Sequence, residues 1–119
     1  ASLVERYMRL ADHLEDQISA REDLELMSSR MWTNVCFRFS PKNYDGDIND
    51  LNSEVRRRMM ENGNFMVSRS NIGDDVIFRA VISNPKITEQ TLDQLLAEIT
   101  LLCDEVQRGL PSNNSFSPQ

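Results

Sequence analysis

The sequence predicts an α+β domain, in which a small four-stranded antiparallel sheet carries helices on one face in the order α-β-β-α-β-β-α. Three segments repeat apolar residues at helical spacing, and four short segments rich in β-branched and aromatic residues lie among them. The strand segments form two pairs separated by a helix, without the long crossovers that parallel strands need. With 119 residues, the chain is long enough for one core but not for two.

The three expected helices have recognisable ends. The first runs from about residue 3 to about residue 20. Asp47 or Asn49 caps the second, and Asn62-Gly63 ends it, because glycine suits the left-handed position that follows a last helical turn. Thr88 caps the third, which stops at Gly109 and Pro111.

The expected strands cover residues 24–27, 32–39, 64–71 and 76–83. The last of these has the strongest β propensity in the chain and is closed by Asn84-Pro85. Strand alternation places Val76, Phe78, Ala80 and Ile82 on one of its faces. The opposite face carries Ile77, Arg79 and Val81.

Arg79 lies between two apolar residues on a face that we expect the chain to leave without a cover. Three helices with one apolar stripe each are about enough for one face of the sheet, so Ile77 and Val81 should lack a partner within this chain. We therefore expect the isolated chain to hide this face, either by dimerising or by folding its first helix across it.

Composition excludes several classes of function. The net charge of −6 and pI of about 4.7 argue against a nucleic-acid partner, and the only basic run, Arg56-Arg57-Arg58, is expected to be a solvated helix face. No membrane-length apolar run or signal peptide is present, so we expect a cytoplasmic protein without a membrane partner. Cys36 and Cys103 are interpreted as reduced core thiols.

The usual catalytic constellations are missing from the sequence. His13 is the only histidine and should lie on the surface, so neither a metal site nor a nucleophile–histidine–acid set is expected. Lys42 and Lys86 lie in polar turns, where nothing would activate them. Arg79 remains: it either pairs with a carboxylate of its own domain, reaches out at a sheet edge, or is held on an apolar face to bind an anion.

Three stretches of the sequence carry a family resemblance. The first is Phe78-Arg79-Ala80-Val81-Ile82-Ser83-Asn84-Pro85, with the Thr-capped helix containing residues 92–99 after it. The others are Thr33-Asn34-Val35-Cys36-Phe37 and the segment that leads to it, Ala20-Arg21-Glu22-Asp23-Leu24-Glu25-Leu26. In order and spacing they resemble the C-terminal part of the group II pyridoxal-phosphate-dependent amino-acid decarboxylases. The branch of glutamate, cysteine-sulfinate and diaminobutyrate decarboxylases is the most similar.

The resemblance implies that residues 1–110 are the small C-terminal domain of such a lyase, packed on a large domain that binds pyridoxal 5′-phosphate and is missing from this chain. It implies that Arg79 binds the carboxylate of the amino-acid substrate. No catalytic or cofactor-binding residue of the family has a counterpart here, so the chain alone should be inactive, and the parent enzyme should be a homo-oligomer, most simply a dimer.

Other interpretations stay open on the sequence alone. A ferredoxin-like regulatory or interaction module could bind a small anion or associate with a copy of itself, and the Ile77/Val81 face could be purely a self-association surface. Residues 111–119 are expected to be a disordered polar tail. The chain begins with Ala1 inside a helical pattern, which suggests a piece of a longer protein.

Overall fold

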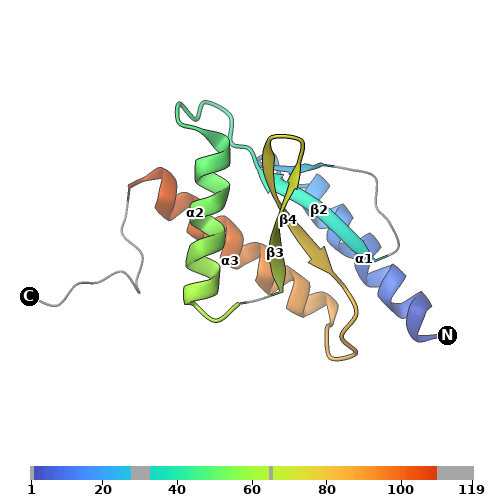
Figure 1. The fold of residues 1–119 in the computed structure, drawn as a ribbon. Helices are drawn as coiled ribbons and strands as arrows, with labels where there is room; N and C mark the ends of the chain where they lie inside the picture. The colour runs from blue at the N-terminus through green and yellow to red at the C-terminus, as the bar shows by residue number, and fades with distance from the viewer. Residues whose placement is uncertain (1, 28–32, 65, 110–119) are drawn as a thin grey trace, which may run out of the picture.

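The computed structural model describes residues 2–27, 33–64 and 66–109, and it confirms the predicted order of elements (Figure 1). The helices and strands are α1 (Leu3–Ser19), β1 (Leu24–Leu26), β2 (Asn34–Phe39), α2 (Ile48–Glu61), β3 (Val67–Ile72), β4 (Asp75–Val81) and α3 (Glu89–Gln107). The strands are shorter than expected at several ends. The expected tail at 111–119 lies outside the described residues.

The four strands form one antiparallel sheet in the order β1-β2-β4-β3. Strand β4 is therefore an inner strand, with β2 on one side and its hairpin partner β3 on the other. Phe37 of β2 lies opposite Phe78 of β4, and their rings make an edge-to-face contact with centroids 5.5 Å apart. This register places alternate residues of β4 in the core and on the opposite side.

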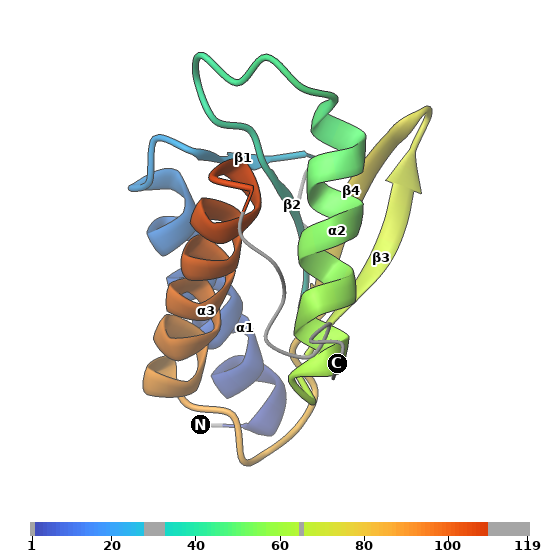
Figure 2. The ribbon, with the colours of Figure 1, turned by 90° about the vertical axis from the view of Figure 1, so that its left-hand side faces the viewer.

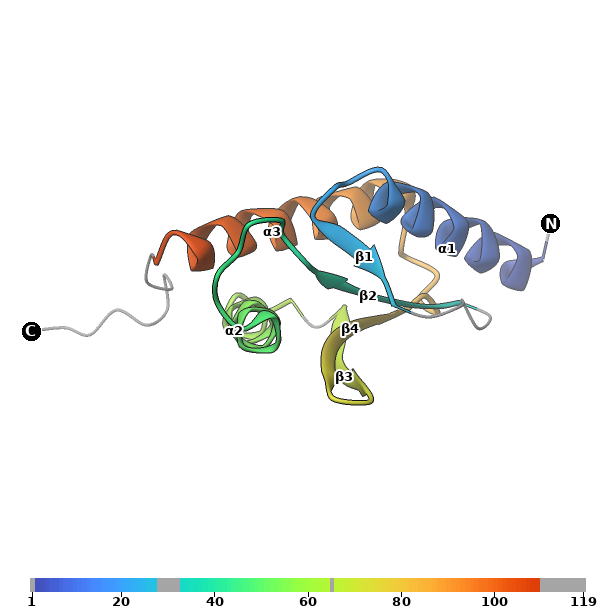
Figure 3. The same cartoon turned by 90° about the horizontal axis from the view of Figure 1, so that it is seen from above.

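All three helices contribute to a single core on one face of the sheet, as predicted. Helices α1 and α3 run along the same side of the sheet in Figure 3, and α2 packs against α3 and against the β3–β4 hairpin (Figure 2). Leu14 and Ile18 of α1 are fully buried in this core. Of the two ways in which the chain was expected to hide the opposite face, folding of the first helix across it is wrong, because the apolar stripe of α1 is already buried beside α3.

Polar side chains connect helix α2 to the sheet. Asp47 is the N-cap of α2, and its carboxylate accepts hydrogen bonds from the backbone N–H groups of Asn49 and Asp50. The side chain of Asn49 reaches the sheet, where its amide donates to the carbonyl of Asp74 and accepts from the N–H of Val76. The turn of the β3–β4 hairpin is thereby attached to the start of α2.

Asn52 is a fully buried amide that is completely hydrogen-bonded. Its Oδ1 accepts from the N–H of Phe39, and its Nδ2 donates to the carbonyls of Phe39 and Ile48, all at 2.8 Å. A buried polar group is tolerated when it is hydrogen-bonded, and here the amide satisfies the last residue of β2. At the other end of α2, Gly63 has a φ of +83°, which confirms the left-handed position predicted after the helix.

Candidate functional site

The side chains of strand β4 point alternately to a closed face and an open face of the sheet. On the closed face, Phe78 and Ala80 are buried in the core. One residue along, Arg79 and Val81 are exposed, Val81 at 43%. We use the name open face for the side of the sheet that carries residues Cys36, Arg38, Ser68, Ile77, Arg79 and Val81, as the strand register groups them.

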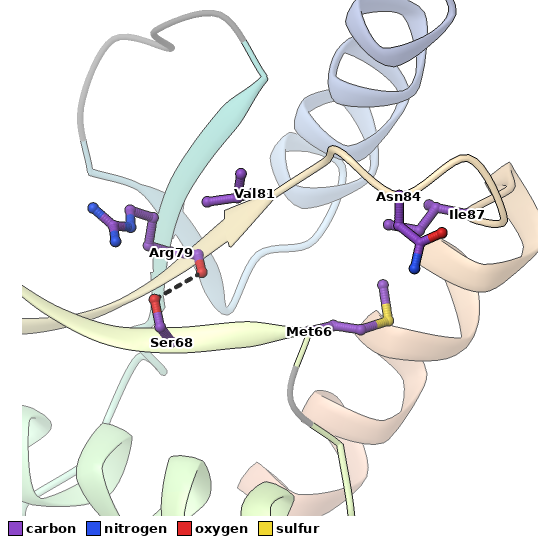
Figure 4. Close-up of a pocket in the computed structure, with 6 residues that line it drawn as sticks. All are labelled: Met66, Ser68, Arg79, Val81, Asn84 and Ile87. Atoms are coloured by element: carbon purple, nitrogen blue, oxygen red, sulfur yellow. Dashed lines mark hydrogen bonds between the residues drawn. The ribbon is translucent and has the colours of Figure 1, made fainter. Parts of the chain in front are cut away.

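A hollow of about 430 Å³ lies on the open face where β3, β4 and the following loop meet (Figure 4). It is lined by Met66, Ser68, Arg79, Val81, Asn84 and Ile87. Ser68 lies opposite Arg79 in the sheet, and its Oγ donates to the Arg79 carbonyl at 3.4 Å. The lining thus combines one arginine with a few small polar and apolar side chains, a composition typical of sites that bind small molecules.

The Arg79 guanidinium neither reaches out at a sheet edge nor pairs with a carboxylate of the described residues. Strand β4 is an inner strand, so Arg79 does not reach out at a sheet edge. No aspartate or glutamate within residues 2–27, 33–64 and 66–109 forms an ion pair with it. The cation is therefore available to a ligand.

Ile77 corrects one sequence expectation. It was expected to lie uncovered beside Val81, but its exposed fraction is only 1%. Continuing the β2–β4 register places Arg38 opposite Ile77, and the Arg38 guanidinium extends between Glu25 of β1, at 3.3 Å, and Asp75 of β4, at 3.5 Å. The stem of an arginine held at both sides in this way can cover an apolar neighbour. The open part of the face is therefore limited to the region around Arg79 and Val81.

The two cysteines are both free, as predicted, but only one is in the core. Cys103 is buried, and burial, together with the charge of Asp23, raises the pKa of its thiol, so the reactive thiolate is suppressed. Cys36 is half-buried on the open face, directly opposite Arg79. The alternation of Cys36 with Val35 and Phe37 in the sequence would have assigned it to the open face.

The arginine run of α2 is not the solvated face that was expected. Arg58 is buried and pairs with Glu54 at 2.8 Å and with Glu105 of α3 at 3.7 Å. Arg57 is exposed and also binds Glu54, and its hydrogen bonds are the main reason that the pKa of Glu54 falls to about 2. The spacing of Glu54 three and four residues before these arginines was the signal that could have predicted the pairs.

His13 lies on the surface, as predicted, but it has partners there. Its Nε2 is 2.8 Å from Asp93 and its Nδ1 is 3.8 Å from Glu89, so it connects α1 to the start of α3. Over the described ranges, no cluster of three or more histidine, cysteine or acidic side chains has the arrangement of a metal site. Within the same ranges, no helix has both the length and the apolarity needed to cross a membrane.

Comparison with known proteins identifies the relatives of this fold. No family model matches the chain. Human acidic amino acid decarboxylase GADL1 is 28% identical over 109 residues, which cover 83% of this chain and 21% of that protein. The crystal structure of mouse CSAD in its apo form is also 28% identical and superposes with a TM-score of 0.75, over 83% of this chain and 23% of the other. The resemblance to the C-terminal domain of group II pyridoxal-phosphate-dependent amino-acid decarboxylases is confirmed.

More distant structures share the fold. Rhodiola rosea 4-hydroxyphenylacetaldehyde synthase is 22% identical with a TM-score of 0.79, and 87% of this chain covers 22% of that one. In each of these comparisons the chain spans about a fifth of its relative's length. The similarity therefore concerns one part of a much larger enzyme.

Proposed function

We propose that this chain is the C-terminal domain, residues 1–110, of a pyridoxal-phosphate-dependent amino-acid decarboxylase, and that Arg79 binds a carboxylate of its substrate. The single observation that carries this proposal is the Arg79 guanidinium, which has no carboxylate partner among the described residues and extends over the open face at the side of the hollow. A guanidinium donates two parallel hydrogen bonds that match the two oxygens of a carboxylate. Relatives that are decarboxylases supply the reason to expect an amino acid as the ligand.

The surroundings of Arg79 favour binding once the open face is covered. Met66, Val81 and Ile87 give the hollow apolar walls, and Asn84 and Ser68 supply small polar groups, while the Arg79 side chain extends away from Met66, Asn84 and Ile87 (Figure 4). In this chain the hollow is open on the side away from the core, so water screens the charge. A second domain placed over the open face would exclude that water, and the charge-assisted hydrogen bonds to a carboxylate would become stronger.

The residues of this chain do not fit pyridoxal phosphate itself. Its two lysines, Lys42 and Lys86, are both exposed and lie outside the helices and strands, so neither occupies the enclosed site that a cofactor-binding lysine needs. We assign the cofactor to the large domain of the parent enzyme. The chain alone is therefore expected to be inactive. As a further part of the proposal, the parent enzyme acts in the cytoplasm as a homodimer.

The experiment that tests the role of Arg79 uses the full-length parent enzyme. Arg79→Met should weaken substrate binding by about 2–5 kcal/mol if the carboxylate pair is buried, which appears as a large rise in KM. Arg79→Lys retains the charge but loses the forked geometry, so it should recover part of the binding. Arg9→Met, which removes an exposed arginine of α1, is the matched control. Unchanged kinetics in Arg79→Met would remove Arg79 from the site.

A second experiment separates this proposal from an autonomous anion-binding module, which the free guanidinium of Arg79 also permits. The 119-residue chain is titrated with acidic amino acids while its backbone amide shifts are followed. Saturable shifts around Arg79 would favour the module, and their absence would favour a half-site that needs its large domain. Carbon dioxide release by the purified chain would contradict the proposal that the cofactor is bound by a large domain outside this chain.

A further inference from the structure

A second cluster of cations lies away from the open face, between helix α2 and strand β3. A cavity of about 260 Å³ is lined there by Ser53, Arg56, Arg57, Met60 and Arg69. Three of its five lining residues are arginines, and no carboxylate is among them. In a chain with a net charge of −6, such a lining does not follow from composition.

The three arginines differ in how far their charge is already matched. Arg57 is held by Glu54 and by Glu61 on its own helix. Within the described ranges, neither Arg56 nor Arg69 has a carboxylate partner. Two guanidinium groups from separate elements thus border one cavity without an internal anion.

Arg56 gives the strongest reason to expect a ligand. Its Nε and Nη1 are buried, and no hydrogen-bond acceptor for them is present in the described part of the chain. A buried donor of a charged group that stays unpaired costs more than an ordinary lost hydrogen bond, so an added acceptor is favoured. Met60 and Arg69 are exposed side chains at the same cavity, and a change in their rotamers can admit a small ligand.

We propose that Arg56 and Arg69, with Ser53, form a binding site for a small oxyanion, a phosphate group or a carboxylate. The forked guanidinium of Arg56 meets two oxygens of such a group, and Arg69 supplies the second charge from β3. The Ser53 hydroxyl can donate a further hydrogen bond. The site is separate from the Arg79 hollow, since the two share no lining residue.

The test is an NMR titration of the 119-residue chain with sodium phosphate and, separately, with sodium glutarate, each against sodium chloride at equal ionic strength. Saturable amide shifts at Ser53, Arg56 and Arg69 are expected with at least one of the two anions. Saturation with phosphate alone identifies a phosphate site, and saturation with glutarate alone identifies a carboxylate site. Absence of saturable shifts with both anions overturns the proposal.

Variants assign the shifts to this cavity. Arg56→Gln combined with Arg69→Gln should lower the affinity by about tenfold or more, because two charge-assisted contacts are lost. Arg69→Gln alone replaces an exposed side chain, so it keeps the test valid if the double variant does not fold. Arg108→Gln, an exposed arginine at the end of α3, is the matched control and should leave the affinity within about twofold.

Arg79→Gln separates this inference from the proposed function. The affinity at the α2–β3 site should be the same in this variant, because Arg79 does not line the cavity. Loss of the shifts in Arg79→Gln, or their persistence in the double variant, would overturn the α2–β3 site. Failure of the site would leave the role of Arg79 in the parent enzyme untouched.

Discussion

The two faces of the sheet differ in what the chain places over them. On the closed face, Phe37 and Phe78 meet in a core to which all three helices contribute. On the open face, Arg79 and Val81 stay exposed beside a hollow, although they alternate with core residues in the same strand. The difference teaches that the side chains of β4 are packed by helices on one face of the sheet, which leaves part of the opposite face available for binding.

This asymmetry also shows how a small domain can present an arginine from a well-held backbone. Arg79 is anchored through its backbone in an inner strand, with β2 and β3 hydrogen-bonded on both sides. Rigid elements hold functional groups more precisely than loops do. The closed face therefore helps to position the backbone of Arg79, from which the exposed side chain extends over the open face.

The largest effect is expected on the closed face, from Phe78→Ala. Phe78 is fully buried and contacts Phe37, so its removal leaves a cavity at the centre of the core. We expect a loss of about 3–5 kcal/mol in the free energy of unfolding, measured by urea denaturation of the chain. A loss below about 1 kcal/mol would mean that the closed face is not the stabilising one.

A smaller loss of stability is expected for Asn52→Ala, in helix α2, where Asn52 contacts the end of β2 on the closed face. The substitution leaves the buried N–H and carbonyl of Phe39 without the amide that satisfies them. The free energy of unfolding should fall by about 2–3 kcal/mol, again by urea denaturation. Asn71→Ala, which removes an exposed amide from β3, is the control and should change stability by less than about 0.5 kcal/mol.

Glu54→Gln tests whether the ion pairs of Glu54 on α2 contribute to the free energy of unfolding, and the effect depends on pH. Because the folded-state pKa of Glu54 is lowered from 4.5 to about 2, its carboxylate stabilises the fold above pH 4.5, and this contribution is lost as the pH falls towards 2. At pH 7 the variant should lose less than about 1 kcal/mol, since Glu54 is partly exposed. Urea denaturation at pH 7 and pH 3 should show the difference between variant and wild type shrinking at the lower pH.

The contribution of Glu54 has a simple control. Glu22→Gln removes an exposed carboxylate from the loop before β1, where no ion pair is formed within the described chain. Its stability relative to wild type should stay constant between pH 7 and pH 3. A pH dependence equal to that of Glu54→Gln would assign the effect to overall charge instead of the Arg57 and Arg58 pairs.

The smallest effects on folding are expected on the open face. Arg79→Ala and Val81→Ala should each change the free energy of unfolding of the isolated chain by less than about 0.5 kcal/mol, because both side chains are exposed. Thermal denaturation of the two variants beside Phe78→Ala measures this directly. A large loss in either one would show that the open face contributes to the stability of the separate chain.

Much of the fold could be predicted because its signals are local. Thr88, Asp47 and Gly63 mark helix ends through hydrogen bonds and backbone angles that involve only a few neighbouring residues. Alternation in β4 correctly separated Phe78 from Arg79. The coverage of Ile77 and the burial of Arg58 were predicted wrongly, because each depends on side chains from other strands or helices. The position of Cys36 was also predicted wrongly, although its alternation with Val35 and Phe37 already indicated the open face.

By itself, the sequence determined the order of elements, the two faces of β4 and the resemblance to the decarboxylase C-terminal domain, since spacing and caps act along the chain. Only the tertiary structure decided that β4 is an inner strand and that Arg79 has no internal carboxylate partner in the described residues. It also brought Arg56 and Arg69 to one cavity. The physical reason is that pairing and burial are set by contacts between distant segments, which appear only when the sheet and its helices are assembled.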